Sequence, residues 1–267
     1  MRRLGVVGLV TLDRVDGGLP RLGGAPYYAA RMLRLLGHPG VLATKIADED
    51  RPRLSALGLP AAVGAAERTV VFRIDHEGDR RTMTLEERGD AWTPEDADGW
   101  LGKALHGVDL VHAGALTRAD FPVETLARLR HGRRVSLDAQ GLVRPAELGP
   151  VHPDDDWDRD VLAQVDVLKV SADEAAVLGV EPDARSLASL GLREVVLTLG
   201  RDGAVVYAEG VAEHVPARPV ETGDATGAGD AFMTAYLSFR LRRHSPRSAG
   251  RLAAEAVHAL LSGWRGR

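Results

Sequence analysis

The chain has 267 residues, of which 45% are hydrophobic, and carries a formal net charge of -4 at pH 7. That length and composition suit one large α/β domain with a sizeable buried core. The absence of cysteine excludes disulfides, thiolate metal sites and cysteine nucleophiles, and the acidic balance gives no basic footprint for nucleic acid.

Strand and helix patterns alternate along the chain from its first residues. Residues 3–10 (RLGVVGLV) predict a buried strand, because the run is too short for a signal peptide and soon meets Asp13. No apolar run reaches the ~18–20 residues of a membrane span, so we expect a soluble, cytoplasmic protein. Further apolar runs predict strands at 108–113, 133–138, 165–170 and 193–199, and helical periodicity predicts helices at 24–36, 95–106, 121–130, 171–179 and 182–190.

Buried strands separated by helices favour a mostly parallel sheet with helices on both faces. After the last of these strands, residues 203–207 and 211–215 predict a hairpin, and helices are expected at about 227–242 and 246–262. We therefore predict a single α/β domain over residues 1–267.

One segment interrupts this alternation. Residues 69–87 (TVVFRIDHEGDRRTMTLEE) read as two strands joined by a turn at Glu77-Gly78-Asp79. Such a hairpin either extends the edge of the sheet or projects from it as a lid over a site. The pattern alone leaves both possibilities open.

A glycine-rich loop, ETGDATGAGDAF (221–232), opens the helix expected at 227–242. Its glycines let backbone N–H groups point into one concavity, and the helix adds unpaired N–H groups and a partial positive charge. Together these features suit a phosphate. Asp230 is then placed to accept a proton from a hydroxyl that attacks the phosphate. The other interpretation is a plain N-cap in a tight turn.

Several common catalytic and nucleotide motifs are missing from the chain. It has no Walker A sequence, no G-x-G-x-x-G after the first strand, no G-x-S-x-G and no H-E-x-x-H. A Rossmann-type oxidoreductase would fit the strand–helix order but lacks its fingerprint here.

The stretch DATGAGDAF (224–232) closely resembles the D-T-x-G-A-G-D-x-F signature of the ribokinase-like (PfkB) carbohydrate and nucleoside kinases. The resemblance implies a ribokinase-like three-layer α/β/α sandwich with a mostly parallel central sheet and a small, reduced β lid. It also implies that Asp230 is the catalytic base, and that an anion hole for the transferred phosphoryl group is formed by Gly227, Ala228 and Gly229.

Other segments match the family in order and spacing, over about residues 3–262. LGGAPYYAARMLRLLG (22–37) is similar to the amino-terminal G-G-x-x-x-N-x-A motif, with a tyrosine where asparagine is usual. DAQGLVR (138–144) looks like the D-x-Q-G-x-x-R form of the branch that includes myo-inositol and some nucleoside kinases. Asp13, expected at the end of the first strand, matches the family's substrate-binding aspartate. The substrate-binding residues implied by these matches are Asp13, Gly23, Gly24, Tyr28, Gln140 and Arg144.

The segments expected to bind the nucleotide, which is the phosphoryl donor, also match the family. LKVSADE (168–174) looks like K-x-N-x-x-E, and VVLTLGRDG (195–203) resembles T-x-G-x-x-G. The implied nucleotide-binding residues are Lys169, Ser171, Thr198, Gly200 and Gly203. The implied metal-binding residues are Glu174, for Mg²⁺ through water, and Asp224 and Thr226, for a monovalent cation, often K⁺. Read without the family, Ser171 and Glu174 are also a good helix start.

The chain departs from the family pattern in places. Ala47 stands where G-x-x-G-x-D has a glycine, and the segment between Asp13 and Gly23 is short. We therefore expect only the 69–86 hairpin to cover the substrate, which favours the lid interpretation. A homodimer through the lid, common in the family, is one possible assembly.

We expect an Mg-ATP-dependent kinase that phosphorylates a hydroxyl of a small sugar, a polyol such as myo-inositol, or a nucleoside. Neither nucleic acid nor membrane is an expected partner. The alternative is a nucleotide- or metabolite-binding regulator of the same fold that has lost catalysis, motivated by Tyr28, Ser171 and Ala47. ATP binding without turnover would favour the regulator.

Overall fold

The computed structural model describes residues 2–78, 80–220 and 226–263. Within these ranges nine strands form one sheet. Its neighbouring strands are parallel except at one edge, where β13 is antiparallel to both β12 and β14. The order across the sheet is β14 (Val211–Val215), β13 (Ala204–Ala208), β12 (Glu194–Thr198), β11 (Val167–Ser171), β9 (Arg134–Asp138), β8 (Leu110–Gly114), β1 (Leu4–Gly8), β4 (Gly40–Ile46) and β5 (Ala61–Ala65).

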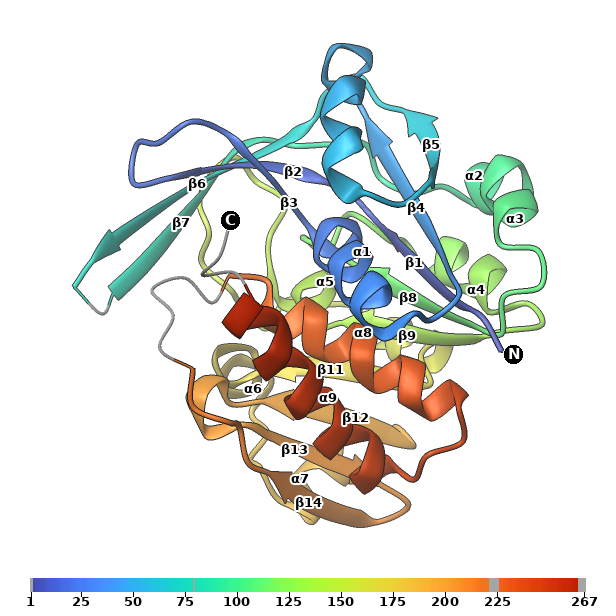
Figure 1. Cartoon of the computed structure of the whole chain (residues 1–267), viewed down its shortest axis with the longest axis vertical. Coiled ribbons are helices and arrows are strands. Elements are labelled where there is room, and N and C mark those ends of the chain that lie inside the picture. Colours follow the sequence, from blue (N-terminus) through green and yellow to red (C-terminus); the bar gives the residue numbers. More distant parts are fainter. Residues whose placement is uncertain (1, 79, 221–225, 264–267) are drawn as a thin grey trace.

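Helices cover both faces of this sheet. One face packs against α1 (Ala25–Leu36), α8 (Ala228–Leu241) and α9 (Pro246–Ser262), which lie together in Figure 1. The other face packs against α2 (Pro94–Asp98), α3 (Trp100–Ala104), α4 (Val123–Arg130), α5 (Gln140–Val143), α6 (Ala172–Leu178) and α7 (Ala184–Ala188). The strands are buried on both faces because each face meets a helix layer, so the expected three-layer α/β/α arrangement is confirmed.

Several boundaries differ from the sequence predictions. The helix expected at 95–106 is two short helices, because the backbone at Gly99, with φ -96° and ψ -117°, leaves the helical region between them. The strands β4 and β5 were not predicted, although GVLATKI (40–46) is an apolar, β-branched run.

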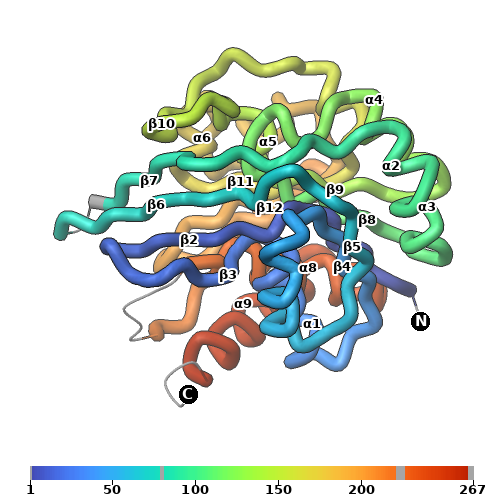
Figure 2. Tube along the Cα trace, turned by 90° about the horizontal axis from the view of Figure 1, so that it is seen from above, coloured from blue at the N-terminus to red at the C-terminus, as the bar shows by residue number. Residues whose placement is uncertain are grey.

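A second sheet lies beside the first. Among the described residues it contains five strands, which Figure 2 shows side by side. Their order is β10 (Gly149–Pro150), β7 (Arg80–Glu87), β6 (Val70–Glu77), β2 (Thr11–Val15) and β3 (Arg21–Gly23).

Two predictions need correction here. The first strand ends at Gly8, and Asp13 lies within β2 of the second sheet rather than at the end of β1. The hairpin expected at 69–86 is β6–β7, but it is not alone, because β2 and β10 flank it and β3 extends the sheet. The short segment before Gly23 is therefore itself part of this sheet.

The second sheet shares its apolar interior with the main domain. Val70, Phe72 and Ile74 of β6 and Leu85 of β7 are buried in one cluster with residues of the central strands. The β6–β7 hairpin projects beyond the central sheet in Figure 1. Met83 of β7 also reaches the domain, with its Sδ 3.9 Å from Arg144 Nη1.

Candidate active site

Polar side chains gather where the central strands end. Asp138 is the last residue of β9, and Lys169 lies beside it in the register of β11. Ser171 and Thr198 end the next two strands and are also register partners. Because parallel strands end at the same edge of a sheet, these residues form one polar row. The sequence had placed Lys169, Ser171 and Thr198 on the donor side, and the fold brings them together.

Lys169 is the centre of a buried ion-pair network. Its side chain is almost fully buried, and Nζ lies 3.2 Å from Asp138 Oδ2 and 3.6 Å from Glu174 Oε2. Burial by itself would lower the pKa of Lys169, but the two carboxylates raise it above its ordinary value. Lys169 is therefore a fixed positive charge beneath the site.

Glu174 is held from three sides. It forms a capping box with Ser171, whose backbone N–H donates to Glu174 Oε2 at 2.7 Å and whose Oγ accepts from Glu174 N at 3.3 Å. Arg144 Nη2 lies 3.9 Å from Glu174 Oε1. The helix start expected at Ser171 is confirmed, and both carboxylate oxygens already have cationic or N–H neighbours.

The glycine-opened first turn of α8 lies next to Lys169 of this network. Gly227 is the N-cap, with φ 76° and ψ 5°, a left-handed conformation that favours glycine. Ala228 and Gly229 open the helix, where backbone N–H groups lack helical partners. A Cβ added to Gly229 would lie 3.4 Å from Lys169 Cε and 3.7 Å from Nζ. The helix N-terminus and the lysine thus place positive charge at one point.

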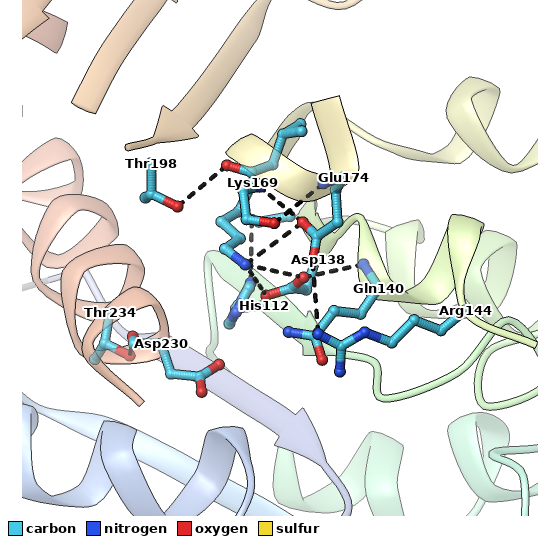
Figure 3. Close-up of polar contacts among 12 residues, drawn as sticks. His112, Asp138, Gln140, Arg144, Lys169, Glu174, Thr198, Asp230 and Thr234 are labelled. Carbon is cyan, nitrogen blue, oxygen red and sulfur yellow. Dashed lines mark hydrogen bonds and ion pairs between the residues drawn. The ribbon is translucent and has the colours of Figure 1, made fainter. Parts of the chain in front are cut away.

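Asp230 lies in the first turn of α8 and points toward the Lys169 network, as Figure 3 shows. It is half-buried. Loss of hydration raises its pKa to about 7, the charge of Asp138 adds to the rise, and Lys169 and Arg144 oppose it. A carboxyl group with that pKa can exchange a proton near neutral pH.

The acceptor-side residues lie where β2, β3 and α1 meet. A Cβ added to Gly23 would lie 2.2 Å from Asp13 Oδ2, so the missing side chain leaves room for the carboxylate. A Cβ added to Gly24, whose φ is 83°, would lie 2.3 Å from the carbonyl oxygen of Leu9. Tyr28 follows in α1, and its ring lies against Gly227. Of the predicted acceptor residues, Tyr28 thus reaches the glycine N-cap of α8.

Other predicted residues have visible structural roles. Gly200 and Gly203 adopt φ values of 59° and 96° in the turn between β12 and β13, where a Cβ on Gly203 would collide with Val215 O. The Gln140 backbone N–H donates to Asp138 Oδ1 at 3.1 Å and starts α5. Thr226 immediately precedes Gly227, whereas Asp224 lies outside the described residues.

The described part of the chain shows neither a metal-binding cluster nor a membrane-spanning helix. No group of three or more His, Cys, Asp or Glu residues there is arranged to hold a metal ion. No helix in the same ranges is both long and apolar enough to cross a membrane.

His112 is a site residue that the sequence did not reveal. It is 1% exposed on β8, and its Nδ1 lies 3.1 Å from Ser136 Oγ. Burial, and next the charge of Lys169, lower its pKa to about 3, so the imidazole is neutral. The available signal was a polar residue on the same face of three adjacent buried strands, at His112, Ser136 and Lys169.

Comparison with known proteins identifies the family. The model of the pfkB family of carbohydrate kinases matches residues 19–261. A fructokinase of Klebsiella pneumoniae is 29% identical, covering 98% of this chain and 92% of its own. An inositol 3-kinase of Zea mays is 36% identical over a shorter stretch, 42% of this chain and 30% of its own.

Solved structures agree with this identification. A pyrophosphate-dependent kinase of the ribokinase family, complexed with a pyrophosphate analogue and myo-inositol, has a TM-score of 0.80 and 25% identity, covering 97% of this chain and 94% of its own. Arabidopsis thaliana ribokinase, complexed with ribose and ATP, has a TM-score of 0.70 and 17% identity, covering 96% and 91%. The chain belongs to the pfkB family of carbohydrate kinases and has the ribokinase-like fold.

Proposed function

We propose that this kinase transfers the γ-phosphoryl group of ATP to a hydroxyl of a small sugar or polyol. One observation carries the proposal: Asp230 stands in the first turn of α8, beside the glycine N-terminus and within the electrostatic influence of Lys169 and Asp138. A proton acceptor beside an anion site is the arrangement that phosphoryl transfer to a hydroxyl requires. The relatives named as kinases give no support to the alternative of a catalytically lapsed regulator.

The proposed step uses this chain's own residues as follows. The acceptor hydroxyl oxygen forms a bond to the γ-phosphorus, the bond to the β–γ bridging oxygen breaks, and ADP leaves. Asp230 takes the hydroxyl proton. Backbone N–H groups at Gly227, Ala228 and Gly229 stabilise the charge on the phosphoryl oxygens. Asp13, beside Gly23, holds the acceptor through its other hydroxyls.

The contacts of Glu174 restrict how Mg²⁺ can bind in the proposed reaction. Glu174 does not fit as a direct Mg²⁺ ligand, because its oxygens already contact Ser171 N, Lys169 and Arg144. We propose that Mg²⁺ is bound by the donor phosphates, as is usual for this ion, with Glu174 reached only through water. The K⁺ site implied for Thr226 and Asp224 stays a prediction.

The identity of the donor needs its own test. The relatives in structure include one protein with ATP and one with a pyrophosphate analogue. Lys169 and Arg144 supply fixed positive charge that suits the phosphates of either donor. We propose ATP, and pyrophosphate is the competing outcome.

The experiment is a product screen on the full chain with Mg²⁺, with and without K⁺. ATP or pyrophosphate is offered with fructose, ribose, myo-inositol and a nucleoside, and ADP, phosphate and phosphorylated product are measured. We expect ATP-dependent phosphorylation of a sugar or polyol, and a ~10²–10⁴-fold lower kcat in Asp230→Asn. Phosphorylation of the nucleoside alone would overturn the proposed sugar or polyol acceptor. Near-wild-type turnover in Asp230→Asn would overturn the proposed role of Asp230 as the base.

A further inference from the structure

The ring of Tyr28 packs directly on the N-cap of α8. Tyr28 lies in the first turn of α1 and is 8% exposed. A Cβ added to Gly227 would lie 2.2–2.3 Å from the ring atoms Cδ1, Cε1 and Cγ. The ring therefore fills the space that any side chain at position 227 would need, and its face covers the Gly227 backbone.

The conformation of Gly227 sets the direction of the anion-hole amides. Its φ of 76° turns the incoming loop into the helix, and its carbonyl accepts the hydrogen bond from Ala231 N at 2.9 Å. Glycine has many alternative conformations of similar energy. A bulky neighbour that covers one side of Gly227 removes part of that freedom.

Tyr28 is itself held in place. Its ring meets the ring of Tyr27 edge to face at 5.2 Å and 72°. The Arg31 guanidinium lies 5.7 Å from the centre of the Tyr27 ring and donates to its hydroxyl at 3.3 Å. Helices α1 and α8 are packed against one another, as Figure 1 shows. Tyr28 is therefore a fixed part of the α1–α8 interface.

We propose that Tyr28 is a positioning residue for phosphoryl transfer: its ring holds Gly227, and with it the amides of Ala228 and Gly229, in the orientation that receives the transferred group. This inference rests on the proposed function. Tyr28 lies in the first turn of the helix that follows the acceptor-side pair Gly23-Gly24. One ring thus links the acceptor side of the site to the anion hole, at a position where the family motif has an asparagine.

Steady-state kinetics separate this role from acceptor binding. Tyr28→Leu removes the flat ring but keeps an apolar side chain, and Tyr28→Phe keeps the ring. The matched control is Tyr27→Leu, one residue earlier on α1. We expect Tyr28→Leu to lower kcat ~10–100-fold with little change in acceptor KM, because the anion hole acts mainly in the transition state.

The expected order of kcat among the variants follows how much of the Tyr28 ring and its support each one keeps. Tyr28→Phe should retain more of kcat than Tyr28→Leu, and Tyr27→Leu, which removes only one support of the Tyr28 ring, should lower kcat less than Tyr28→Leu does. A Tyr28→Leu enzyme with unchanged kcat would overturn the proposal. A raised acceptor KM with unchanged kcat would also overturn it, and would assign Tyr28 to acceptor binding instead.

A second measurement does not depend on activity. Urea unfolding of Gly227→Ala is compared in the wild-type and Tyr28→Leu backgrounds. If the ring holds Gly227, the alanine methyl collides with it only in the wild-type background, so the substitution costs less stability when Tyr28 is leucine. Equal costs in both backgrounds would overturn the contact. A wild-type chain inactive in the product screen would refute the proposed function while leaving this comparison valid.

Discussion

Two features of Asp230 raise the affinity of its carboxylate for a proton. It is half-buried in the first turn of α8, and it is exposed to the negative charge of Asp138. Both raise the pKa of its carboxyl group, while Lys169 and Arg144 limit the rise. The charges around Asp230, which come from different elements, therefore set the pH range in which its carboxyl group titrates.

The activity should consequently depend on pH near neutrality. Only ionised Asp230 accepts a proton, and its pKa is raised to about 7. We expect kcat/KM to rise ~10-fold per pH unit below that value and to level off above it. A pH–rate profile from pH 5.5 to 8.5 measures this. A flat acid limb would contradict the assignment of Asp230 as the base.

The same carboxyl group should make stability depend on pH. Its pKa is 3.8 in the unfolded chain and about 7 in the folded chain, so between those values the folded chain binds the extra proton. Stability then falls as pH rises through this window. We expect Tm of Asp230→Asn relative to wild type to increase from pH 5 to pH 8. A constant difference would show that Asp230 keeps its ordinary pKa in the fold.

The Lys169 network should matter far more to folding than an exposed ion pair. Lys169→Met leaves the buried Asp138 without its cationic partner and Glu174 with Arg144 alone, which costs ~3–5 kcal/mol of unfolding free energy. The matched control is Arg68→Met, whose partner Glu87 is 2.8 Å away on the surface and which should cost at most ~1 kcal/mol. Urea unfolding of both variants gives the comparison, and equal costs would contradict a buried network.

At the scale of elements, α8 is anchored to the central sheet well beyond its catalytic end. The Tyr236 hydroxyl donates to Glu194 Oε1 at 2.6 Å, and Arg240 Nη2 lies 2.9 Å from Glu194 Oε2. Glu194 is the first residue of β12, and Thr198 ends the same strand in the polar row of the site. These contacts fix α8 against the strand, whereas the Tyr28 ring fixes its first turn.

Removal of one anchor should affect stability more than chemistry. Tyr236→Phe leaves a buried carboxylate with one hydrogen bond fewer, which we expect to cost ~1–3 kcal/mol. Because Arg240 still pairs with Glu194, α8 should stay in place and kcat should change little. Guanidinium unfolding with an unchanged m-value, together with the turnover assay, tests this. A kcat loss comparable to that of Asp230→Asn would show that Tyr236 also controls the site.

At the scale of the whole molecule, the two sheets share one apolar interior. Phe72 of the second sheet is buried in the same cluster as Trp92, which is stacked on Phe121 at 5.8 Å. The second sheet has no separate cluster of its own among the described residues. It should therefore unfold together with the three-layer domain.

Thermal unfolding followed by two probes checks this. Far-ultraviolet ellipticity reports all elements, and tryptophan fluorescence reports the surroundings of the four tryptophans, among them Trp92 in the shared interior. We expect coincident transitions. Phe72→Ala, which opens a cavity in the shared interior and costs ~3–5 kcal/mol, should shift both transitions equally. An early transition seen by ellipticity alone would mean that the second sheet melts on its own.

Much of this arrangement could be read from local patterns. Apolar runs separated by helical periodicity predicted the central strands β1, β8, β9, β11 and β12, because burial on both faces leaves a continuous apolar signature. The predicted Ser171–Glu174 helix start is confirmed, since capping depends only on residues a few positions apart. The glycine loop likewise pointed to Gly227 and Asp230 from their place before an apolar helix.

Contacts between distant segments gave no such signal. The pairing of β2 with β6 joins residues about 60 positions apart, so the extent of the second sheet was missed and Asp13 was placed on the wrong strand. His112 looked like an isolated histidine until three strands aligned it with Ser136 and Lys169.

The sequence by itself determined the fold class and the family signature, and it singled out Asp230 as the candidate base, because these depend on periodicity and on residues adjacent in the chain. Only the tertiary structure decided how Asp230 is charged and how Gly227 is held. Asp138, Lys169 and Tyr28 reach the start of α8 from three separate elements. Electrostatic and steric effects act through space, so the properties of the site appear only once those elements are packed.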